Sequence, residues 1–283
     1  MGIDPVYERL PPTIRGDNSS NELLSRVEAV ERFCRGVLDA VAPHVPCVKI
    51  QSACFERYLW HGVELYHRLV QQARALDLIV IGDAKRGDVG FSSEHYAAGC
   101  LGDQTFGGFA DLEGPDAITV NSYMGIDAIE PFISLASSQG KGLFVLVRTS
   151  NPGSDAVQSL KLDDGRNVCD AVAEMVSDTG GTPGLVGASG YSLLGAVVGA
   201  TKREDIVRLR RIMPKQIFLV PGYGPQGANA DDMRGCFNDD GAGAIISASR
   251  SVLYASEKTP GGWLKAVAQA AADLNQQIRS ILV

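Results

Sequence analysis

The sequence lacks the patterns that mark several large classes of protein. It contains no run of roughly 18 uninterrupted apolar residues, so no membrane-spanning helix is expected. Segment 1–10 contains charged residues and no apolar core of the kind found in secretory signals. It also contains no block of roughly five or more lysines and arginines, and its net charge is −7. We therefore expect neither a nucleic acid nor an anionic membrane surface as a partner.

Patterns typical of disulfides and of metal sites are also missing. The chain has six cysteines but no C-x-x-C, and four histidines but no H-x-x-x-H. Irregularly spaced cysteines of this kind are typical of free thiols in a reducing compartment. The sequence thus predicts a cytoplasmic protein with no bound metal.

Helical and strand-like segments alternate along nearly the whole chain. Ser19-x-x-Glu22 has the form of a capping box, and apolar residues then recur at steps of three and four, which predicts a helix from residue 23 to 41. Further helices are expected at about 56–76, at 205–213 and from Trp263 onward. No low-complexity linker interrupts the pattern, so we expect one domain over residues 1–283.

Short, continuously apolar segments predict the strands of a buried parallel sheet. They are 47–50, 78–81, 117–120, 143–147, 196–198, 217–220 and 244–246, with an incomplete one at 1–3. About eight repeated β-α units favour an α/β fold of the (β/α)8 TIM-barrel type. The alternative is an open doubly wound sheet, which usually carries G-x-G-x-x-G after its first strand. That motif is absent there, which disfavours this alternative without removing it.

Charged residues gather where the third strand ends, and in a barrel the chemistry lies at such ends. Asp83 and Lys85 are two residues apart, so in an extended segment they point to the same face, and Asp88 follows on the turn. Lys49 interrupts an apolar strand, and a buried lysine needs a carboxylate partner. A purely structural ion-pair network is the alternative. The position at a strand's exit favours a functional site.

Two loops near the C-terminus have features of a phosphate site. Segment 221–227 is rich in glycine and contains Gln226, and Arg250 follows the eighth predicted strand. The alternative is a pair of glycine turns with a surface arginine. After the fifth and fourth strands, Ser150 and Asn121 suit recognition of an amide or carbonyl edge, although such residues also form ordinary turns.

These motifs together resemble the orotidine 5′-phosphate decarboxylase family. D-A-K-R-G-D at 83–88, followed by Val89 and Ser92, is similar to its D-x-K-x-x-D signature, in the form of the longer-chain bacterial branch (type 2 subfamily). The resemblance continues in order through further segments. These are V-K-I at 48–50, N-S-Y-M-G at 121–125, R-T-S-N-P at 148–152, V-G-A-T at 198–201, P-G-Y-G-P-Q-G at 221–227 and S-A-S-R-S at 247–251.

The resemblance implies a TIM barrel that acts as a homodimer with shared active sites and needs no cofactor. By position, Lys85 is the implied proton donor, with Asp83, Asp88 and Lys49 completing a charged network. The resemblance also implies the residues that bind the substrate. Asp4 would hold the ribose with Lys49, and Gln226 and Arg250 would hold the phosphate. Asn121 and Ser150 would lie near the pyrimidine, while Asp88, Val89 and Ser92 would reach the neighbouring subunit's ligand. Only residues 1–3 precede Asp4, fewer than the family's first strand has.

The implied reaction is decarboxylation of orotidine 5′-phosphate to uridine 5′-phosphate and CO2, the last step of de novo pyrimidine nucleotide synthesis. One alternative is a Mg²⁺-dependent sugar-phosphate decarboxylase or aldolase of the same superfamily. Those enzymes resemble a site with a glutamate where this chain has Lys49. A catalytically silent nucleotide-binding barrel is the other alternative, and the intact Asp83, Lys85 and Asp88 disfavour it.

Overall fold

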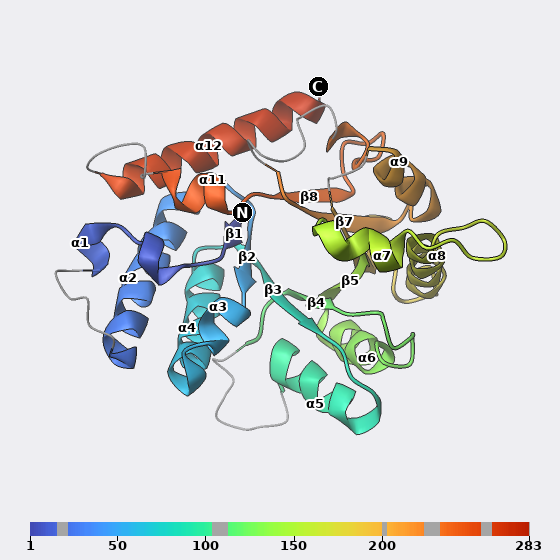
Figure 1. Ribbon diagram of the computed structural model, residues 1–283, viewed down its shortest axis with the longest axis horizontal. Helices are drawn as coiled ribbons and strands as arrows, with labels where there is room; N and C mark the ends of the chain where they lie inside the picture. Colours follow the sequence, from blue (N-terminus) through green and yellow to red (C-terminus); the bar gives the residue numbers. More distant parts are fainter. Residues whose placement is uncertain (16–21, 104–112, 200–202, 224–232, 256–261, 283) are drawn as a thin grey trace. The chain divides into compact units, whose positions relative to one another are not determined.

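The sheet has eight strands in sequential order, as the computed structural model of the chain shows (Figure 1). The structure describes residues 1–15, 22–103, 113–199, 203–223, 233–255 and 262–282. The strands are β1 (Gly2–Ile3), β2 (Cys47–Gln51), β3 (Ile79–Arg86), β4 (Ala117–Val120), β5 (Gly142–Arg148), β6 (Ser192–Val198), β7 (Gln216–Pro221) and β8 (Ala244–Ser247).

The fold is a (β/α)8 barrel. β1, β2 and β3 pair in parallel, and so do β4 to β8, each with its successor in the chain. The Gly2 N–H donates to the carbonyl of Ala248, the residue after β8, at 2.8 Å. The doubly wound alternative is wrong, because the strand order of such a sheet reverses part-way.

Helices lie between most successive strands. They are α1 (Pro12–Arg15), α2 (Leu23–Val41), α3 (Ala53–Glu56), α4 (Leu59–Ala75), α5 (Gly90–Leu101), α6 (Glu130–Gln139), α7 (Asp155–Gln158), α8 (Val168–Gly180), α9 (Arg203–Ile212), α11 (Arg250–Leu253) and α12 (Trp263–Leu282). Two short 3-10 helices are η1 (Tyr7–Arg9) and η2 (Pro152–Ser154). No helix in these described ranges is both long and apolar enough to cross a membrane.

The expected helices are confirmed, with changes at their ends. α2 buries the predicted apolar stripe of Val27, Val30, Cys34, Val37 and Val41. Glu22 is its N-cap and makes no side-chain capping bond, while Ser19 lies outside the described residues. The helix expected at about 56–76 is α4, which begins at Leu59 and ends at Ala75, and the short helix α3 precedes it.

The strand predictions are also confirmed, and several strands are longer than the apolar runs. All four residues of β4 are buried, as expected for a parallel strand covered on both faces. β3 continues beyond its apolar part through Asp83 and Lys85 to Arg86. Both charged residues therefore belong to the strand itself. All six cysteines are free thiols, as predicted.

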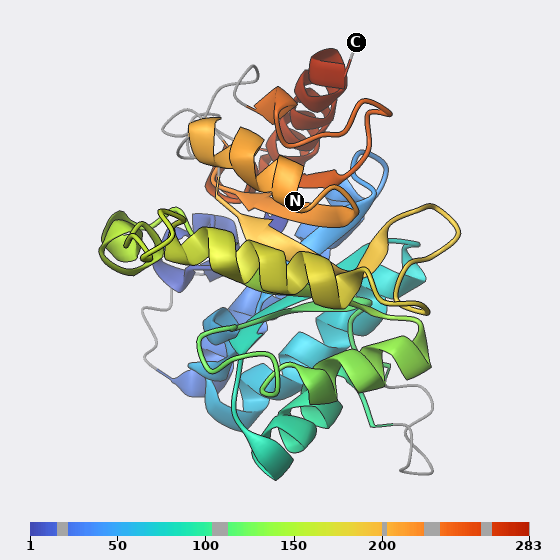
Figure 2. The same ribbon diagram turned by 90° about the vertical axis from the view of Figure 1, so that its right-hand side faces the viewer.

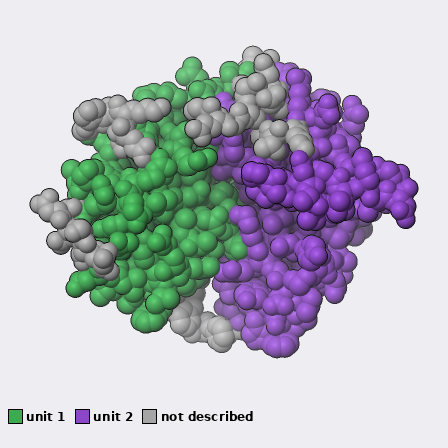
Figure 3. Space-filling model, in the orientation of Figure 1, with its two compact units in different colours: residues 1–84, 104–116, 248–280 green, residues 85–103, 117–247, 281–283 purple. Residues whose placement is uncertain are grey.

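The chain forms two compact units, shown in green and purple in Figure 3. Unit 1 comprises residues 1–84, 104–116 and 248–280. In it α2 packs against α4, and α4 packs against β2. Phe33 of α2 stacks on Trp263 of α12 with ring centroids 5.2 Å apart, so an N-terminal and a C-terminal helix pack together within this unit.

Unit 2 comprises residues 85–103, 117–247 and 281–283. Its helix α8, yellow-green in Figure 2, packs against β5, β6 and α9, and α5 packs against α6. The strands β4 to β8 are parallel, so their carboxyl ends lie along one edge of the sheet. That edge carries the loops in which barrels place their functional residues.

Candidate functional site

In unit 1 a buried lysine and a buried aspartate form a close ion pair. Lys49 is 7% exposed and Asp83 is 5% exposed, and Lys49 Nζ lies 2.6 Å from Asp83 Oδ2. Gln51 Nε2 donates to the same oxygen at 3.1 Å. Gln51 and Asp83 are also partners in the β2–β3 register, so the parallel pairing of these strands sets the geometry of the cluster. The predicted carboxylate partner of Lys49 is confirmed.

The charge of Lys49 is secured by two carboxylates. Burial alone would lower the pKa of its ammonium group, but the nearby Asp4 and Asp83 outweigh that effect and hold the pKa above its ordinary value of 10.5. Because the folded-state pKa is raised, the pair's contribution to stability is fully present at neutral pH. It is lost as the pH rises from the ordinary value of 10.5 through the raised pKa of the folded state.

Asp4 directly follows β1 and faces the same lysine. Its Oδ1 lies 3.7 Å from Lys49 Nζ, and this buried oxygen accepts no hydrogen bond from the described residues. The Ser249 Oγ is also buried and also makes no hydrogen bond with the described residues. A Cβ at Gly2 would lie 2.9 Å from Ser249 Cβ and 3.5 Å from Asp4 Oδ1, so these two side chains flank the backbone of β1. Two buried oxygens that accept no hydrogen bond from the described residues suit a hydroxyl-bearing ligand.

In unit 2 Lys85 has an unusual backbone conformation. Its φ is +49°, in the left-handed region that non-glycine residues rarely occupy. The Lys85 N–H donates to Thr119 Oγ1 of β4 at 2.9 Å, and the Asn121 N–H donates to the Arg86 carbonyl at 2.7 Å. The same-face expectation for Asp83 and Lys85 assumed extended backbone, and that assumption is wrong at Lys85. The side chain of Lys85 is exposed.

The other predicted residues of this segment lie at the start of α5 and after β4. Asp88 is half-buried, and its Oδ1 accepts a hydrogen bond from the N–H of Val89, the N-cap of α5, at 2.8 Å. Val89 is exposed and Ser92 is half-buried in α5. Asn121 follows β4, and its Oδ1 accepts from the Tyr123 N–H at 3.0 Å, the local turn contact typical of asparagine.

Ser150 lies on the same strand edge of unit 2, after β5. A Cβ at Gly199 would lie 2.9 Å from Ser150 N, and one at Gly222 would lie 4.0 Å from Ser150 Oγ. Ser150 therefore lies close to the residues that follow β6 and β7. Its side chain is exposed.

Of the two residues predicted to hold a phosphate, the structure describes only Arg250. Arg250 begins the short helix α11 in unit 1 and is exposed. Gln226 lies outside the described residues, as does most of its glycine-rich loop. In the ranges that the structure describes, no group of three or more His, Cys, Asp or Glu side chains could hold a metal ion.

Comparison with known proteins establishes the family. The family model of orotidine 5′-phosphate decarboxylase / HUMPS matches residues 27–260. The chain belongs to this family. The orotidine 5′-phosphate decarboxylase of Rhodopirellula baltica is 38% identical over 99% of this chain and 93% of its own length. That of Deinococcus radiodurans is 40% identical over 84% of this chain and 82% of its own length.

A solved structure agrees with the family and with the barrel. The OMP decarboxylase of Leishmania donovani superposes with a TM-score of 0.74 at 27% identity, covering 94% of this chain and 91% of its own. Three polar residues near the predicted site residues were nevertheless not expected from the sequence. Gln51 shares a strand face with Lys49, Thr119 is the one polar residue of β4, and Ser249 precedes Arg250. A polar residue inside an apolar strand was the available signal for Thr119.

We predict that Lys49→Met lowers the free energy of unfolding by about 3–5 kcal/mol, because it leaves the Asp83 carboxylate buried without its cation. Urea unfolding measures the change. The double variant Lys49→Met/Asp83→Asn should recover part of the loss, since the stranded charge is gone. Lys161→Met, at an exposed lysine, should stay within about 0.5 kcal/mol of the parent. Equal losses in the single and double variants would contradict the pairing.

Proposed function

We propose that this protein decarboxylates orotidine 5′-phosphate to uridine 5′-phosphate and CO2, the last step of de novo pyrimidine nucleotide synthesis. The family and the names of its curated relatives support this reaction. The observation that carries the residue roles is the geometry of β3. This strand holds Asp83 against the buried Lys49 and, two residues later, holds Lys85 in a left-handed backbone conformation.

In the proposed mechanism Lys85 serves the reacting carbon. Loss of CO2 breaks the bond between ring carbon six and the carboxylate, and the electron pair stays on the ring carbon. No adjacent carbonyl absorbs that charge, so a cation next to it stabilises the developing anion. The Lys85 ammonium then donates a proton to the same carbon and completes the product.

Asp83, Asp88 and Lys49 complete the proposed charged network. Asp83 is fixed by Lys49 and Gln51, so its carboxylate is positioned before substrate arrives. Such preorganised charges cost no reorganisation when the reaction occurs. Cys54 adds no charge to this network, because burial raises the pKa of its thiol to about 11 and keeps it protonated at neutral pH.

The remaining predicted residues are proposed to bind the substrate. Asp4 with Lys49 takes the ribose hydroxyls, which suits the buried Asp4 Oδ1 that accepts no hydrogen bond from the described residues. Ser150 and Asn121 are assigned to the pyrimidine edge, and Gln226 and Arg250 to the phosphate. Arginine suits this last role, since its guanidinium binds phosphate with two parallel hydrogen bonds.

We further propose a cytoplasmic homodimer with shared active sites, in which residues 1–283 act as one domain. Both compact units are built from discontinuous segments, which supports a single domain. Asp88, Val89 and Ser92 are assigned to the neighbouring subunit's ligand, and Val89 is 50% exposed and so accessible. Membership of the type 2 subfamily stays a prediction. No cofactor is assigned, because a cation at Lys49 disfavours a metal where the related Mg²⁺ enzymes place a glutamate.

The purified protein is expected to consume orotidine 5′-phosphate at the same rate with and without EDTA. The loss of substrate is followed by its absorbance. The chelator separates this reaction from that of a Mg²⁺-dependent relative. Turnover that stops in EDTA and returns with Mg²⁺ would overturn the assignment, and an absence of turnover in both conditions would favour a silent nucleotide-binding barrel.

Lys85→Ala is expected to remove nearly all turnover, since a general acid alone contributes about 10²–10⁴-fold and the cation adds electrostatic stabilisation. Thermal unfolding of the same preparation should change little, because the side chain is exposed. Lys85→Gly is the control for the backbone: it should be equally inactive yet more stable than Lys85→Ala, because glycine adopts positive φ without strain. Retained turnover with a lower melting temperature would indicate a structural role.

Mixing Lys85→Ala protein with Asp88→Ala protein is expected to restore activity. If each site takes Lys85 from one chain and Asp88 from the other, a heterodimer regains one site with both residues, while its second site lacks both. Activity is measured after subunit exchange has been demonstrated with labelled chains. No recovery despite exchange would exclude the shared site for Asp88.

A further inference from the structure

The last residue of β5, Arg148, is a fully buried cation at the strand edge of unit 2. It is 1% exposed, and its guanidinium contacts four side chains. Nε lies 2.9 Å from Asp205 Oδ2, and Nη2 pairs with Asp155. Nη1 reaches Ser154 Oγ and Gln158 Oε1, both at 3.4 Å. A planar fork with several donors suits such an arrangement, in which the buried charge is matched by carboxylates.

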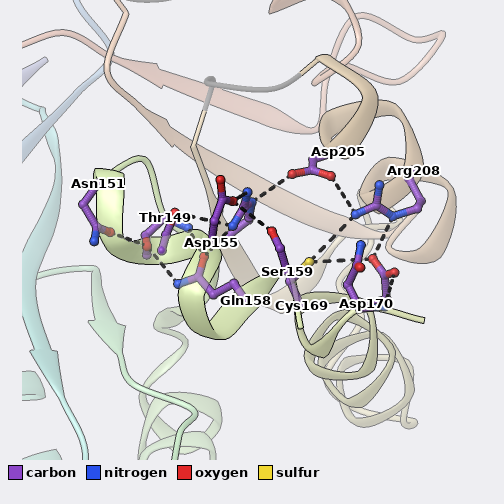
Figure 4. Close-up of polar contacts among 12 residues, drawn as sticks. Thr149, Asn151, Asp155, Gln158, Ser159, Cys169, Asp170, Asp205 and Arg208 are labelled. Carbon is purple, nitrogen blue, oxygen red and sulfur yellow. Dashed lines mark hydrogen bonds and ion pairs between the residues drawn. The ribbon is translucent and has the colours of Figure 1, made fainter. Parts of the chain in front are cut away.

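Gln158 extends this cluster to both neighbours of Ser150 (Figure 4). Its Oε1 accepts from the Thr149 N–H at 2.9 Å, and its Nε2 donates to Thr149 Oγ1 at 2.8 Å. Thr149 Oγ1 in turn donates to Asn151 Oδ1 at 2.7 Å. The residues before and after Ser150 are thus fixed by hydrogen bonds that begin at Arg148.

The backbone of the same segment is held from β6. The Gly199 N–H donates to the Arg148 carbonyl at 2.7 Å. A Cβ at Gly199 would lie 3.0 Å from Ser150 Cβ, so the two backbones pack closely. Ser150 and Asn151 are both exposed in this segment, but the Asn151 side chain is bonded to Thr149, whereas the exposed Ser150 side chain lies near Gly199 and Gly222, which follow β6 and β7.

The outer part of the network supplies a matched control. Asp205 also pairs with Arg208 Nη2 at 2.7 Å, and Arg208 Nε lies 2.8 Å from Asp170 of α8 (Figure 4). Arg208 therefore shares Asp205 with Arg148, yet none of its contacts in the described part of the chain reaches Thr149, Ser150 or Asn151.

We propose that Arg148 is a positioning residue, which holds Thr149 and Asn151 through Gln158 so that the Ser150 hydroxyl is presented to the substrate's ring. This inference rests on the proposed role of Ser150. A loop fixed in advance does not have to be ordered when the ligand binds, and small misplacements of a binding group are costly. Arg148 itself is too deeply buried to meet the substrate.

A double-mutant cycle between Arg148 and Ser150 tests the proposal. Ser150→Ala should lower kcat/KM about 3- to 10-fold, the value of one hydrogen bond. Arg148→Met should lower it by a similar factor in the parent and by less than about twofold in the Ser150→Ala background. Arg148→Lys, which keeps the charge but not the fork, should lie between Arg148→Met and the parent. Losses that multiply in the double variant would overturn the proposal.

Two further variants separate positioning from stability. Gln158→Ala breaks the link without stranding a buried charge, so it should reproduce the loss of kcat/KM even if Arg148→Met folds poorly. Arg208→Met should lower the melting temperature and leave kcat/KM unchanged. An unchanged kcat/KM in Gln158→Ala, with a reduced one in Ser150→Ala, would overturn the proposal.

The same cycle is run on the dissociation constant for uridine 5′-phosphate, measured by calorimetry. If the parent binds this nucleotide without any turnover, the proposed reaction fails while the cycle on binding still decides the role of Arg148. If Ser150→Ala changes neither binding nor turnover, Ser150 has no role and the inference fails with it.

Discussion

A lysine inside a parallel sheet is tolerated only where a carboxylate matches its charge, and the pairing of Lys49 with Asp83 meets that condition. The pair lies across neighbouring strands, so it depends on the β2–β3 register, in which Gln51 is opposite Asp83. A shift of β3 by one residue would turn Asp83 to the other face of the sheet, away from Lys49 and Gln51. The sheet register and the charged cluster are therefore one constraint, and the proposed chemistry at the end of β3 depends on it.

Unit 2 also contains a buried cation that is matched by carboxylates, the guanidinium of Arg148. Lys49 presents a compact charge to one close carboxylate oxygen, whereas Arg148 spreads its contacts over two carboxylates, a hydroxyl and an amide. The fork of Arg148 reaches α9 on one side and the segment after β5 on the other. One buried charge thereby couples the packing of a barrel helix to the placement of Ser150, which a point charge on a flexible stem would not do as well.

Much of this could be predicted from local patterns. Continuous apolar runs identify the strands because both faces of a parallel sheet are covered, and the single lysine in β2 predicts its own carboxylate. The contacts of Arg148 could not be predicted in this way. Its partners Asp155 and Asp205 lie on separate helices, and in the sequence they look like ordinary surface aspartates. The end of β3 was also misjudged, because apolar periodicity does not report where hydrogen bonding continues through polar residues.

The backbone of Lys85 shows most clearly where local rules fail. Three non-glycine residues in the described ranges have φ in the left-handed region. Leu59 begins α4 and Asp77 lies in the turn before β3, where such conformations relieve a change of direction. Lys85 instead lies within a strand, where the hydrogen bond to Thr119 holds it. Strain of this kind persists only when its surroundings impose it, and it gathers at sites where a side chain must be aimed. The left-handed conformation at Lys85 therefore accords with its proposed role, which requires the ammonium group to be aimed at the reacting carbon.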